Sequence, residues 1–440
     1  MKEDPAQKKT VLGPCQIDNP LVSGDCHGVK TRFVEDSERV LVDISFESAR
    51  RTCSAKEDFL SFEKAGPREK IFFDPSKTRS AIVTCGGICP GINDVIRAVV
   101  MTLYYRYGVR EILGIRNGYQ GLVKGSGFDP IPMDPEWVDH INHTGGTVLG
   151  TSRGAQPPEA IADFIAERRI DQLFTIGGDG TMKGASAIAS AAEKRGLTLS
   201  VVGIPKTVDN DILFIDRSFG FISASSAAGE VVETAHAEAK SQHNGIGLVK
   251  LMGRDSGFIS CLAALASGNA NFVLVPEVPF DLEGEKGFLK CLEKRILERK
   301  HAVILVSEGA GQEHIPAVKE ERDASGNVKF QDIGPFLRDR INAYFKSKGT
   351  EVNLKYIDPS YMVRAIGPVA VDSAYCYTLG ENAVHAAMAG RNRIVIGIVN
   401  NRNVHIPMDL VVKGRRRIDP EGELWFSVLE ATGQPARFKP

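Results

Sequence analysis

The chain has 440 residues, of which 42% are hydrophobic and 25% are charged, and its formal net charge is −1. This length predicts two or three domains, and the composition is ordinary for a soluble globular protein. A nearly neutral chain has no overall field that attracts nucleic acid or an anionic membrane, so we expect neither partner. No apolar run is as long as a membrane span, and the charged start of the chain does not resemble a secretory signal.

The eight cysteines are scattered, and most of them lie in apolar surroundings. We therefore expect reduced, buried thiols in a cytoplasmic protein. Cys85 and Cys89 are four residues apart, but Cys89 lies inside GGICPG and no second Cys/His pair has matching spacing. The sequence therefore does not favour a metal site at these two cysteines.

Residues 1–70 are polar and charged, and we interpret them as an extension packed on the main body, with an edge strand within 39–44. A disordered tail is the alternative for about the first 20 residues. From residue 80 the pattern becomes strand, glycine-rich turn and helix, with helices expected at 93–107 and 182–192. The expected strands are 81–85, 111–115, 173–176, 199–204, 247–251, 271–275, 302–306 and 393–399.

These strands are continuous apolar runs, which indicates that both faces of each sheet are covered, as in parallel α/β proteins. They are too many for one small sheet, so two α/β domains with a cleft between them are expected. The polar and glycine-rich motifs follow the strands directly, which is where open α/β sheets bind ligands.

The motif Gly177-Gly178-Asp179-Gly180-Thr181 follows the run 173–176. Its three glycines leave a backbone surface that a polyphosphate can approach, and the following helix, expected from Met182, would point its N–H groups there. Asp179 could then hold the divalent cation that accompanies a polyphosphate. An ordinary tight turn after a strand is the alternative.

The motif Pro205-Lys206-Thr207-Val208-Asp209-Asn210-Asp211 follows the run 199–204. In an extended loop Asp209 and Asp211 point the same way. Near a polyphosphate, one carboxylate can hold Mg²⁺ indirectly while the other accepts a proton from an attacking hydroxyl. Thr207 can hydrogen-bond to a phosphoryl oxygen or to the acceptor. The alternative is an Asx turn in which the aspartates cap backbone N–H groups.

Four further motifs carry charged or aromatic groups. Arg254, in MGRDSG, could neutralise a transferring phosphoryl group or pair with the aspartate that follows it. Glu308, at a strand end, could bind sugar hydroxyls, cap a helix or pair with a cation. Tyr361 and Arg364 share one face of a helix or turn, and Arg364 could bind phosphate or form a surface ion pair. Arg153, in TSRG, could lie over a nucleotide phosphate, unless this segment is an ordinary turn.

Together these motifs resemble the phosphofructokinase family. They occur in the family's order and approximate spacing, between about residues 70 and 410: GGICPG at 86–91, TSRG at 151–154, GGDGT at 177–181, PKTVDND at 205–211, MGRDSG at 252–257, SEGAGQ at 307–312 and YIDPSYMVRA at 356–365. The resemblance is strongest to the longer ATP-dependent enzymes of plants and related microbes.

The resemblance implies two Rossmann-like, three-layer α/β domains with largely parallel sheets and an active site in the interdomain cleft. We expect a larger nucleotide-binding domain at 71–220 plus 364–412 and a smaller fructose 6-phosphate-binding domain at 221–363 plus 413–440, with the extension at 1–70. It also implies a cytoplasmic, allosteric homo-oligomer, a dimer or tetramer.

The implied reaction is a glycolytic one, in which a kinase transfers the γ-phosphoryl group of ATP, with Mg²⁺, to the 1-hydroxyl of fructose 6-phosphate. Asp209 would be the general base, Thr207 would contact the acceptor, and Arg254 would stabilise the transferring group. Asp179 would hold Mg²⁺, with Asp211 assisting. The nucleotide site would consist of Gly86, Arg153, Gly154, Gly178, Asp179, Gly180, Thr181 and Lys206. The fructose 6-phosphate site would consist of Thr207, Asp209, Met252, Gly253, Arg254, Glu308, Tyr361 and Arg364, with Arg364 on the 6-phosphate.

Departures from the family's small bacterial enzymes limit what the resemblance implies. Those enzymes have glycine at the Lys206 position, histidine at the Tyr361 position, and an intersubunit arginine where this chain has Gly245. Their intersubunit site and their effectors are therefore not expected here. Pyrophosphate-dependent relatives have aspartate at the Gly180 position and lysine at the Lys206 position, so this chain combines one feature of each donor type. Gly180 should dominate, because a carboxylate there would repel an α-phosphate.

Three alternatives differ in function. A pyrophosphate-dependent phosphotransferase differs only in the donor. NAD kinases and lipid kinases share GGDGT, but they would not explain PKTVDND, MGRDSG and YMVRA together. A non-catalytic regulatory subunit would be expected to have lost its acids, whereas Asp179, Asp209 and Asp211 are all present.

Overall fold

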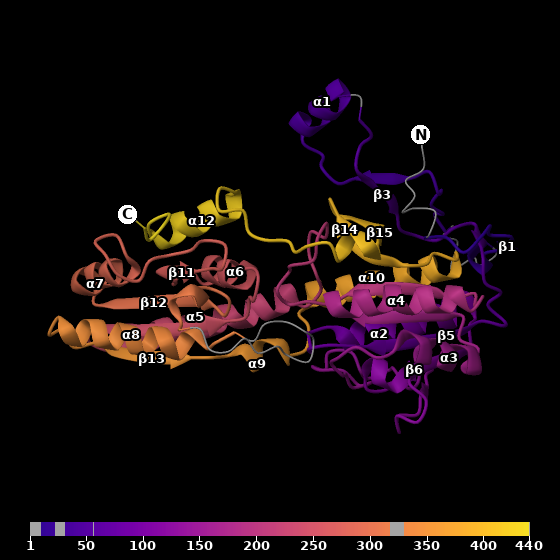
Figure 1. Cartoon of the computed structure of the whole chain (residues 1–440), viewed down its shortest axis with the longest axis horizontal. Helices are drawn as coiled ribbons and strands as arrows, with labels where there is room; N and C mark the ends of the chain where they lie inside the picture. Colours follow the sequence, from indigo (N-terminus) through magenta and orange to yellow (C-terminus); the bar gives the residue numbers. More distant parts are fainter. Residues whose placement is uncertain (1–9, 23–30, 56, 317–329, 440) are drawn as a thin grey trace. The chain divides into compact units, whose positions relative to one another are not determined.

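The computed structural model describes residues 10–22, 31–55, 57–316 and 330–439 (Figure 1). Parts of the expected N-terminal extension therefore lie outside the described residues. The chain divides into two compact units, each built from several segments. Unit 1 consists of Met1–Thr207, Ile212–Gly220 and Gly367–Gly414, and unit 2 consists of Val208–Asp211, Phe221–Ile366 and Arg415–Pro440.

Unit 1 contains a nine-stranded sheet. Its strands, in spatial order, are β2 (Arg39–Leu41), β3 (Ser61–Lys64), β15 (Arg402–Pro407), β14 (Ile394–Val399), β9 (Ser200–Pro205), β8 (Gln172–Gly177), β5 (Arg79–Thr84), β6 (Glu111–Ile115) and β7 (Ile131–Pro132). The pairs from β14 to β6 are parallel, and the pairs at both edges are antiparallel. Every residue of β8 and β9 is buried, because helices cover both faces of the sheet.

The helices of unit 1 form two packed pairs, one of α2 with α10 and one of α3 with α4. Both α10 and α4 contact β9, and the arrangement has three layers. The helical segments are η1 (Pro20–Val22), α1 (Phe46–Ala55), α2 (Ile92–Met101), the π-helical η2 (Thr102–Tyr107), η3 (Gly118–Leu122), α3 (Pro158–Arg168), α4 (Asp179–Lys194), α10 (Ala370–Met388) and α11 (Met408–Val411). A two-stranded antiparallel sheet, β1 (Ile17–Asp18) with β4 (Lys70–Ile71), completes the unit.

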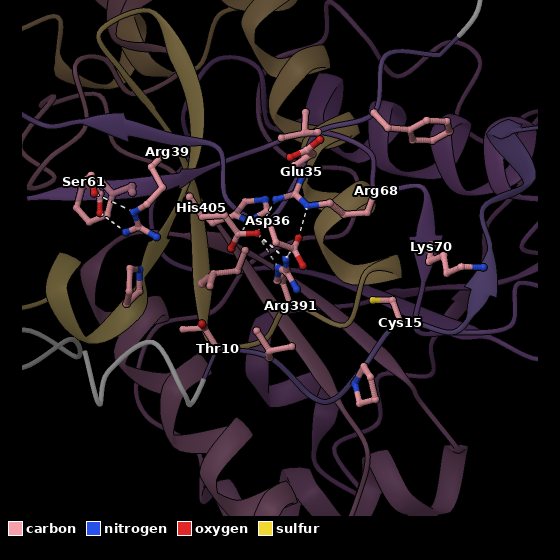
Figure 2. Close-up of a pocket in the computed structure, with 18 of the residues that line it drawn as sticks. Thr10, Cys15, Glu35, Asp36, Arg39, Ser61, Arg68, Lys70, Arg391 and His405 are labelled. Carbon is pink, nitrogen blue, oxygen red and sulfur yellow. Dashed lines mark hydrogen bonds and ion pairs between the residues drawn. The ribbon is translucent and has the colours of Figure 1, made fainter. Parts of the chain in front are cut away.

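A cluster of ion pairs joins the N-terminal strands to the rest of unit 1 (Figure 2). The guanidinium of Arg391, which follows α10, contacts Asp36 at 2.5 Å and Glu63 at 2.6 Å. Arg68 pairs with the same two carboxylates, at 2.7 and 2.5 Å. Both arginines are buried beside a cavity of about 1060 Å³, and a buried charge is stable only when it is paired. These pairs therefore hold β2 and β3 on the edge of the sheet.

Unit 2 contains a four-stranded parallel sheet. Its strands, in spatial order, are β11 (Phe272–Leu274), β12 (His301–Ser307), β10 (Gly245–Leu251) and β13 (Asn353–Ile357). The helical segments are α5 (Phe221–Ser241), α6 (Phe258–Ser267), α7 (Phe288–Arg299), η4 (Gln312–His314), α8 (Ile333–Ser347), α9 (Ser360–Arg364) and α12 (Glu423–Thr432). The core includes Phe280, Phe288 and Phe345, and α12 packs on α6 and β11.

The expected fold class is confirmed: the chain has mixed α/β units with largely parallel sheets. All the strands expected between residues 81 and 399 are present. The strands that the sequence did not predict are β1, β3, β4, β7, β13 and β15. Of these, β13 is a partly exposed edge strand and β15 carries polar residues. The helix expected from Met182 begins earlier, at Asp179, because the N–H of Met182 already bonds to the carbonyl of Gly178.

Two further expectations concern the thiols and the membrane. The seven cysteines within the described residues form no disulfide, and Cys85, Cys89, Cys261 and Cys376 are buried. Among the helices that the structure describes, none has the length and apolar character that crossing a membrane requires.

Candidate active site

The glycine-rich motif at 177–181 forms the end of β8 and the first turn of α4, rather than a loop before the helix. Gly177 has to be glycine for packing reasons, because a Cβ there would lie 2.1 Å from the Thr181 hydroxyl oxygen. At Gly180 a Cβ would meet no atom within 4 Å. The backbone N–H groups of this turn and the open space beside it suit an anionic ligand.

Lys206 lies next to this turn, because β8 and β9 are parallel neighbours and Gly177 pairs with Pro205. Its side chain is buried, and its ammonium group donates a hydrogen bond to the carbonyl of Gly87. Gly86 follows the next parallel strand, β5, and a Cβ on it would lie 3.6 Å from the Lys206 Nζ atom. The carboxyl ends of three adjacent strands thus bring glycine turns and one buried cation together.

The TSRG segment is attached to the same place. The Thr151 hydroxyl donates to the carbonyl of Gly86 at 2.6 Å, and the N–H of Gly86 donates to the carbonyl of Ser152 at 3.1 Å. Arg153 is exposed, and Gly154 has a φ of 96°, which favours glycine. All the residues predicted to bind nucleotide therefore belong to unit 1 and follow β5, β8 and β9 or the attached TSRG turn.

The chain passes from unit 1 to unit 2 inside PKTVDND, since Thr207 belongs to unit 1 and residues 208–211 to unit 2. The expected extended loop is not found, because Asn210 has a left-handed φ of 55°. Asp209 and Asp211 nevertheless interact. Burial, and then the nearby carboxylates of Asp211 and Glu308, raise the pKa of Asp209 to about 8. A carboxyl with such a pKa can accept a proton near neutral pH.

The MGRDSG motif follows β10 in unit 2. Gly253 has a φ of 126°, and a Cβ there would lie 2.4 Å from the carbonyl oxygen of Ser256. The guanidinium of Arg254 lies 4.2 Å from the centre of the Phe330 ring. Asp255, which the alternative interpretation pairs with Arg254, forms an ion pair with Arg415 at 3.2 Å.

Glu308 follows β12, the parallel neighbour of β10. Burial raises the pKa of its carboxyl, while the positive charges of Arg254, Lys250 and Arg364 lower it. These cations therefore lie close enough to Glu308 to affect its charge. A glycine must follow it, because a Cβ on Gly309 would lie 1.9 Å from the carbonyl oxygen of Arg254.

The YMVR segment forms α9, after the edge strand β13. The Tyr361 side chain is 76% exposed, and the Arg364 guanidinium lies 4.8 Å from the centre of its ring. Three adjacent strands, β12, β10 and β13, thus end in the segments that carry Glu308, Met252 to Arg254, and Tyr361 with Arg364. Apart from Thr207, the residues predicted to bind the acceptor are all in unit 2.

A family model described as Phosphofructokinase matches residues 79–387, which is most of the chain. The chain belongs to the phosphofructokinase family. The matched range contains every motif described above.

Phosphofructokinases from bacteria and plants are similar to this chain over nearly its full length. The ATP-dependent 6-phosphofructokinase of Borreliella burgdorferi is 48% identical, and the alignment covers 97% of this chain and 96% of the relative. The ATP-dependent 6-phosphofructokinase 1 of Arabidopsis thaliana is 44% identical, with 96% of this chain and 88% of the relative covered. The expected resemblance to plant enzymes is therefore confirmed.

Among solved structures, a pyrophosphate-dependent phosphofructokinase from Marinobacter aquaeolei is similar, with a TM-score of 0.66 and 22% identity. The alignment covers 82% of this chain and 93% of the Marinobacter aquaeolei chain. At this identity the likeness supports the phosphofructokinase fold and says nothing about the donor.

The residues present fit a magnesium ion that arrives with a nucleotide. Asp179 is partly buried on the first turn of α4, and its carboxylate forms an ion pair with Lys183 at 2.9 Å, which a bound metal ion would replace. Within the described ranges, no group of three or more His, Cys, Asp or Glu residues could hold a metal ion alone. Mg²⁺ is commonly held by one or two carboxylates together with substrate phosphates, which matches this donor set. Asp211 is ion-paired with Arg415, so its assisting role stays a prediction.

Sequence reasoning missed three residues that support these segments. The Tyr119 hydroxyl, from η3, donates a hydrogen bond to the carbonyl of Thr181 at 2.7 Å and so stabilises the first turn of α4. The Thr151 hydroxyl bonds to the carbonyl of Gly86, and Arg415 forms ion pairs with Asp211 and Asp255. No local pattern marks Tyr119, and the run RRR at 415–417 has the composition of a solvated surface.

Proposed function

We propose that the protein is an ATP-dependent 6-phosphofructokinase that converts fructose 6-phosphate to fructose 1,6-bisphosphate. The observation that carries this proposal is the near full-length similarity, at 48% identity, to a protein of that name. The acidic residues predicted for the active site, Asp179, Asp209 and Asp211, are all present, which argues against a non-catalytic subunit.

The residues of unit 1 would bind the phosphoryl donor. The first turn of α4 offers backbone N–H groups to the phosphates, and Lys206 adds a positive charge beside the Gly86 turn. Arg153 and Gly154 would contact the nucleotide from the attached TSRG segment. A metal ion held by Asp179 would neutralise charge on the β- and γ-phosphates.

The residues of unit 2, with Thr207, would bind and activate the acceptor. Asp209 would accept the proton of the sugar 1-hydroxyl as that oxygen bonds to the γ-phosphorus and the bond to the β-phosphate oxygen breaks, releasing ADP. Arg254 would stabilise the charge on the transferring phosphoryl group. Arg364 would bind the 6-phosphate, and Glu308 would accept hydrogen bonds from sugar hydroxyls. Met252, Gly253 and Tyr361 would line the same site.

Phosphoryl transfer requires the donor bound by the first set of residues to meet the acceptor bound by the second set. We therefore propose that the active site lies in a cleft between the nucleotide-binding and fructose 6-phosphate-binding domains. Residues 71–220 plus 364–412 would form the first domain, and 221–363 plus 413–440 the second. Cross-linking between cysteines introduced at Gly86 and Tyr361, with and without both substrates, would test whether the two sets approach each other.

Pyrophosphate is the alternative donor, and Lys206 is the feature that favours it. Activity of the purified protein with fructose 6-phosphate and Mg²⁺, measured separately with ATP and with pyrophosphate, distinguishes the two. We expect kcat/KM to be much higher with ATP. A preference for pyrophosphate would overturn the donor, and inactivity with both would overturn the function. The cytoplasmic location and a dimeric or tetrameric state stay predictions, and light scattering measures the second.

A further inference from the structure

The basic run Arg415-Arg416-Arg417 belongs to unit 2, although it directly follows the last residue of unit 1. A charge run of this kind usually lies in solvent, yet Arg415 and Arg416 are only partly exposed. Within unit 2 they contact PKTVDND, which contains the proposed base, and MGRDSG, which contains the proposed phosphoryl-binding arginine.

The guanidinium of Arg415 bridges these two motifs. Its Nη1 atom forms an ion pair with Asp211, whose side chain is 4% exposed, and its Nε atom lies 3.2 Å from a carboxylate oxygen of Asp255. Asp211 lies two residues after Asp209, and Asp255 directly follows Arg254. One planar, permanently charged group therefore contacts both acidic residues, in the geometry for which arginine is better suited than lysine.

Backbone bonds hold the segment that carries Arg415. The N–H of Arg416 donates to the carbonyl of Asp211 at 2.8 Å. The N–H groups of Ile418 and Gly257 both donate to the same carboxylate oxygen of Glu277, at 2.9 and 3.1 Å. The Arg416 guanidinium also lies 4.8 Å from the centre of the Phe258 ring. The segment is thus attached at both ends to the loops that it contacts, so that Arg415 has a fixed position.

We propose that Arg415 is a positioning residue for phosphoryl transfer, which holds the 209–211 loop and the MGRDSG turn in their relative geometry through Asp211 and Asp255. The inference rests on the proposed function and adds a residue outside the motifs that predicted it. Under this proposal Arg415 affects turnover through Asp209 and Arg254, whereas the residues predicted to bind the donor are all in unit 1. Loss of Arg415 should therefore lower kcat and leave the KM for ATP unchanged.

The test is Arg415→Met, with Arg417→Met as the matched control, because Arg417 belongs to the same run and is exposed. A misplacement of about 1 Å in reacting groups can cost ~10²-fold, so we expect kcat of R415M to fall by roughly that factor. R417M should keep wild-type kcat. Arg415→Lys should recover part of the loss, and added guanidinium ion should raise the kcat of R415M but not that of the wild type.

A second variant keeps the test decisive if R415M does not fold. Asp255→Asn removes one of the two carboxylates that Arg415 contacts and leaves the ion pair with Asp211. D255N should lower kcat without changing the KM for ATP. The double variant should lose no more kcat than R415M alone, because R415M already removes the contact with Asp255. Wild-type kcat in R415M, or in D255N where R415M does not fold, would overturn the positioning role alone. A wild-type protein without phosphofructokinase activity would instead overturn the proposed function and this inference with it.

Discussion

The Ser256 hydroxyl donates a hydrogen bond to the backbone carbonyl of Asp209 at 2.9 Å, so the proposed base and the MGRDSG turn are directly connected. Ser256 is fully buried, which protects this bond from competition by water. Its position fixes the backbone of Asp209 rather than the carboxyl group. The side chain of Asp209 can therefore be changed without removing the bond that holds its loop.

Asp209→Asn should remove the proton acceptor while keeping the size of the side chain. General-base loss typically costs ~10²–10⁴-fold in turnover, and we expect kcat to fall by that much. The KM for fructose 6-phosphate should change far less, because Thr207 and Arg364 still contact the substrate in the proposed site. Steady-state kinetics with both substrates measure this. A fall in kcat of less than about tenfold would show that Asp209 is not the base.

The activity should depend on pH through the same carboxyl. Its pKa is raised to about 8, and only the deprotonated form accepts a proton, so kcat/KM for fructose 6-phosphate should rise with pH and level off above about 8. Asp211→Asn removes a negative charge that raises this pKa, so the same rise should occur at lower pH. An identical pH profile in D211N would contradict this origin of the titration.

Arg364→Ala should act mainly through the sugar phosphate. A charge-assisted hydrogen bond contributes about 1.5–3 kcal/mol, so the KM for fructose 6-phosphate should rise by ~10- to 100-fold while the KM for ATP stays near wild type. Lys355→Ala, which removes an exposed cation from the preceding strand β13, serves as the control and should change neither KM. Equal increases in both KM values would indicate that Arg364 is structural.

Arg391→Met should loosen β2 and β3 from the rest of unit 1. It leaves Asp36 and Glu63 with Arg68 alone in place of two arginines, so the cost should be smaller than the about 3–5 kcal/mol of leaving a buried charge unpaired. Hydrogen exchange at 61–64 should become faster, since β3 pairs with β15 beside this cluster. Lys70→Met removes an exposed ion pair with Asp18 and should have little effect. Unchanged exchange in the Arg391 variant would mean that the strand pairing alone holds the extension.

How much of this could be predicted from the sequence depends on how local the determinants are. The buried strands β8, β9, β10 and β12 are continuous apolar runs, and Lys206 and Glu308 follow two of them directly, so the placement of both residues at strand ends could be inferred. The bend at Asn210 could not, because its left-handed backbone depends on tertiary contacts. The contacts of Arg415 could not be inferred either, since its two carboxylate partners are about 200 and 160 residues away in the chain.

The last prediction concerns Gly180, which we expect to determine the donor. A Cβ at this position meets no protein atom within 4 Å, and the backbone is that of a helix's first turn, where an acidic residue interacts favourably with the helix dipole. Gly180→Asp should therefore fold and keep its thermal stability. Any loss of activity would then come from the ligand rather than from the protein.

With ATP, the new carboxylate would lie close to the α-phosphate. At an effective dielectric constant near 20, two like charges about 4 Å apart repel by roughly 4 kcal/mol, and steric overlap adds to this, so ATP use should collapse. Pyrophosphate has no α-phosphate, and Lys206 is already present beside the turn, so G180D should use pyrophosphate relatively better than the wild type does. Measuring kcat/KM for both donors, with Gly180→Ala as an uncharged control, separates charge from size. ATP activity in G180D close to that of the wild type would show that another residue controls the donor.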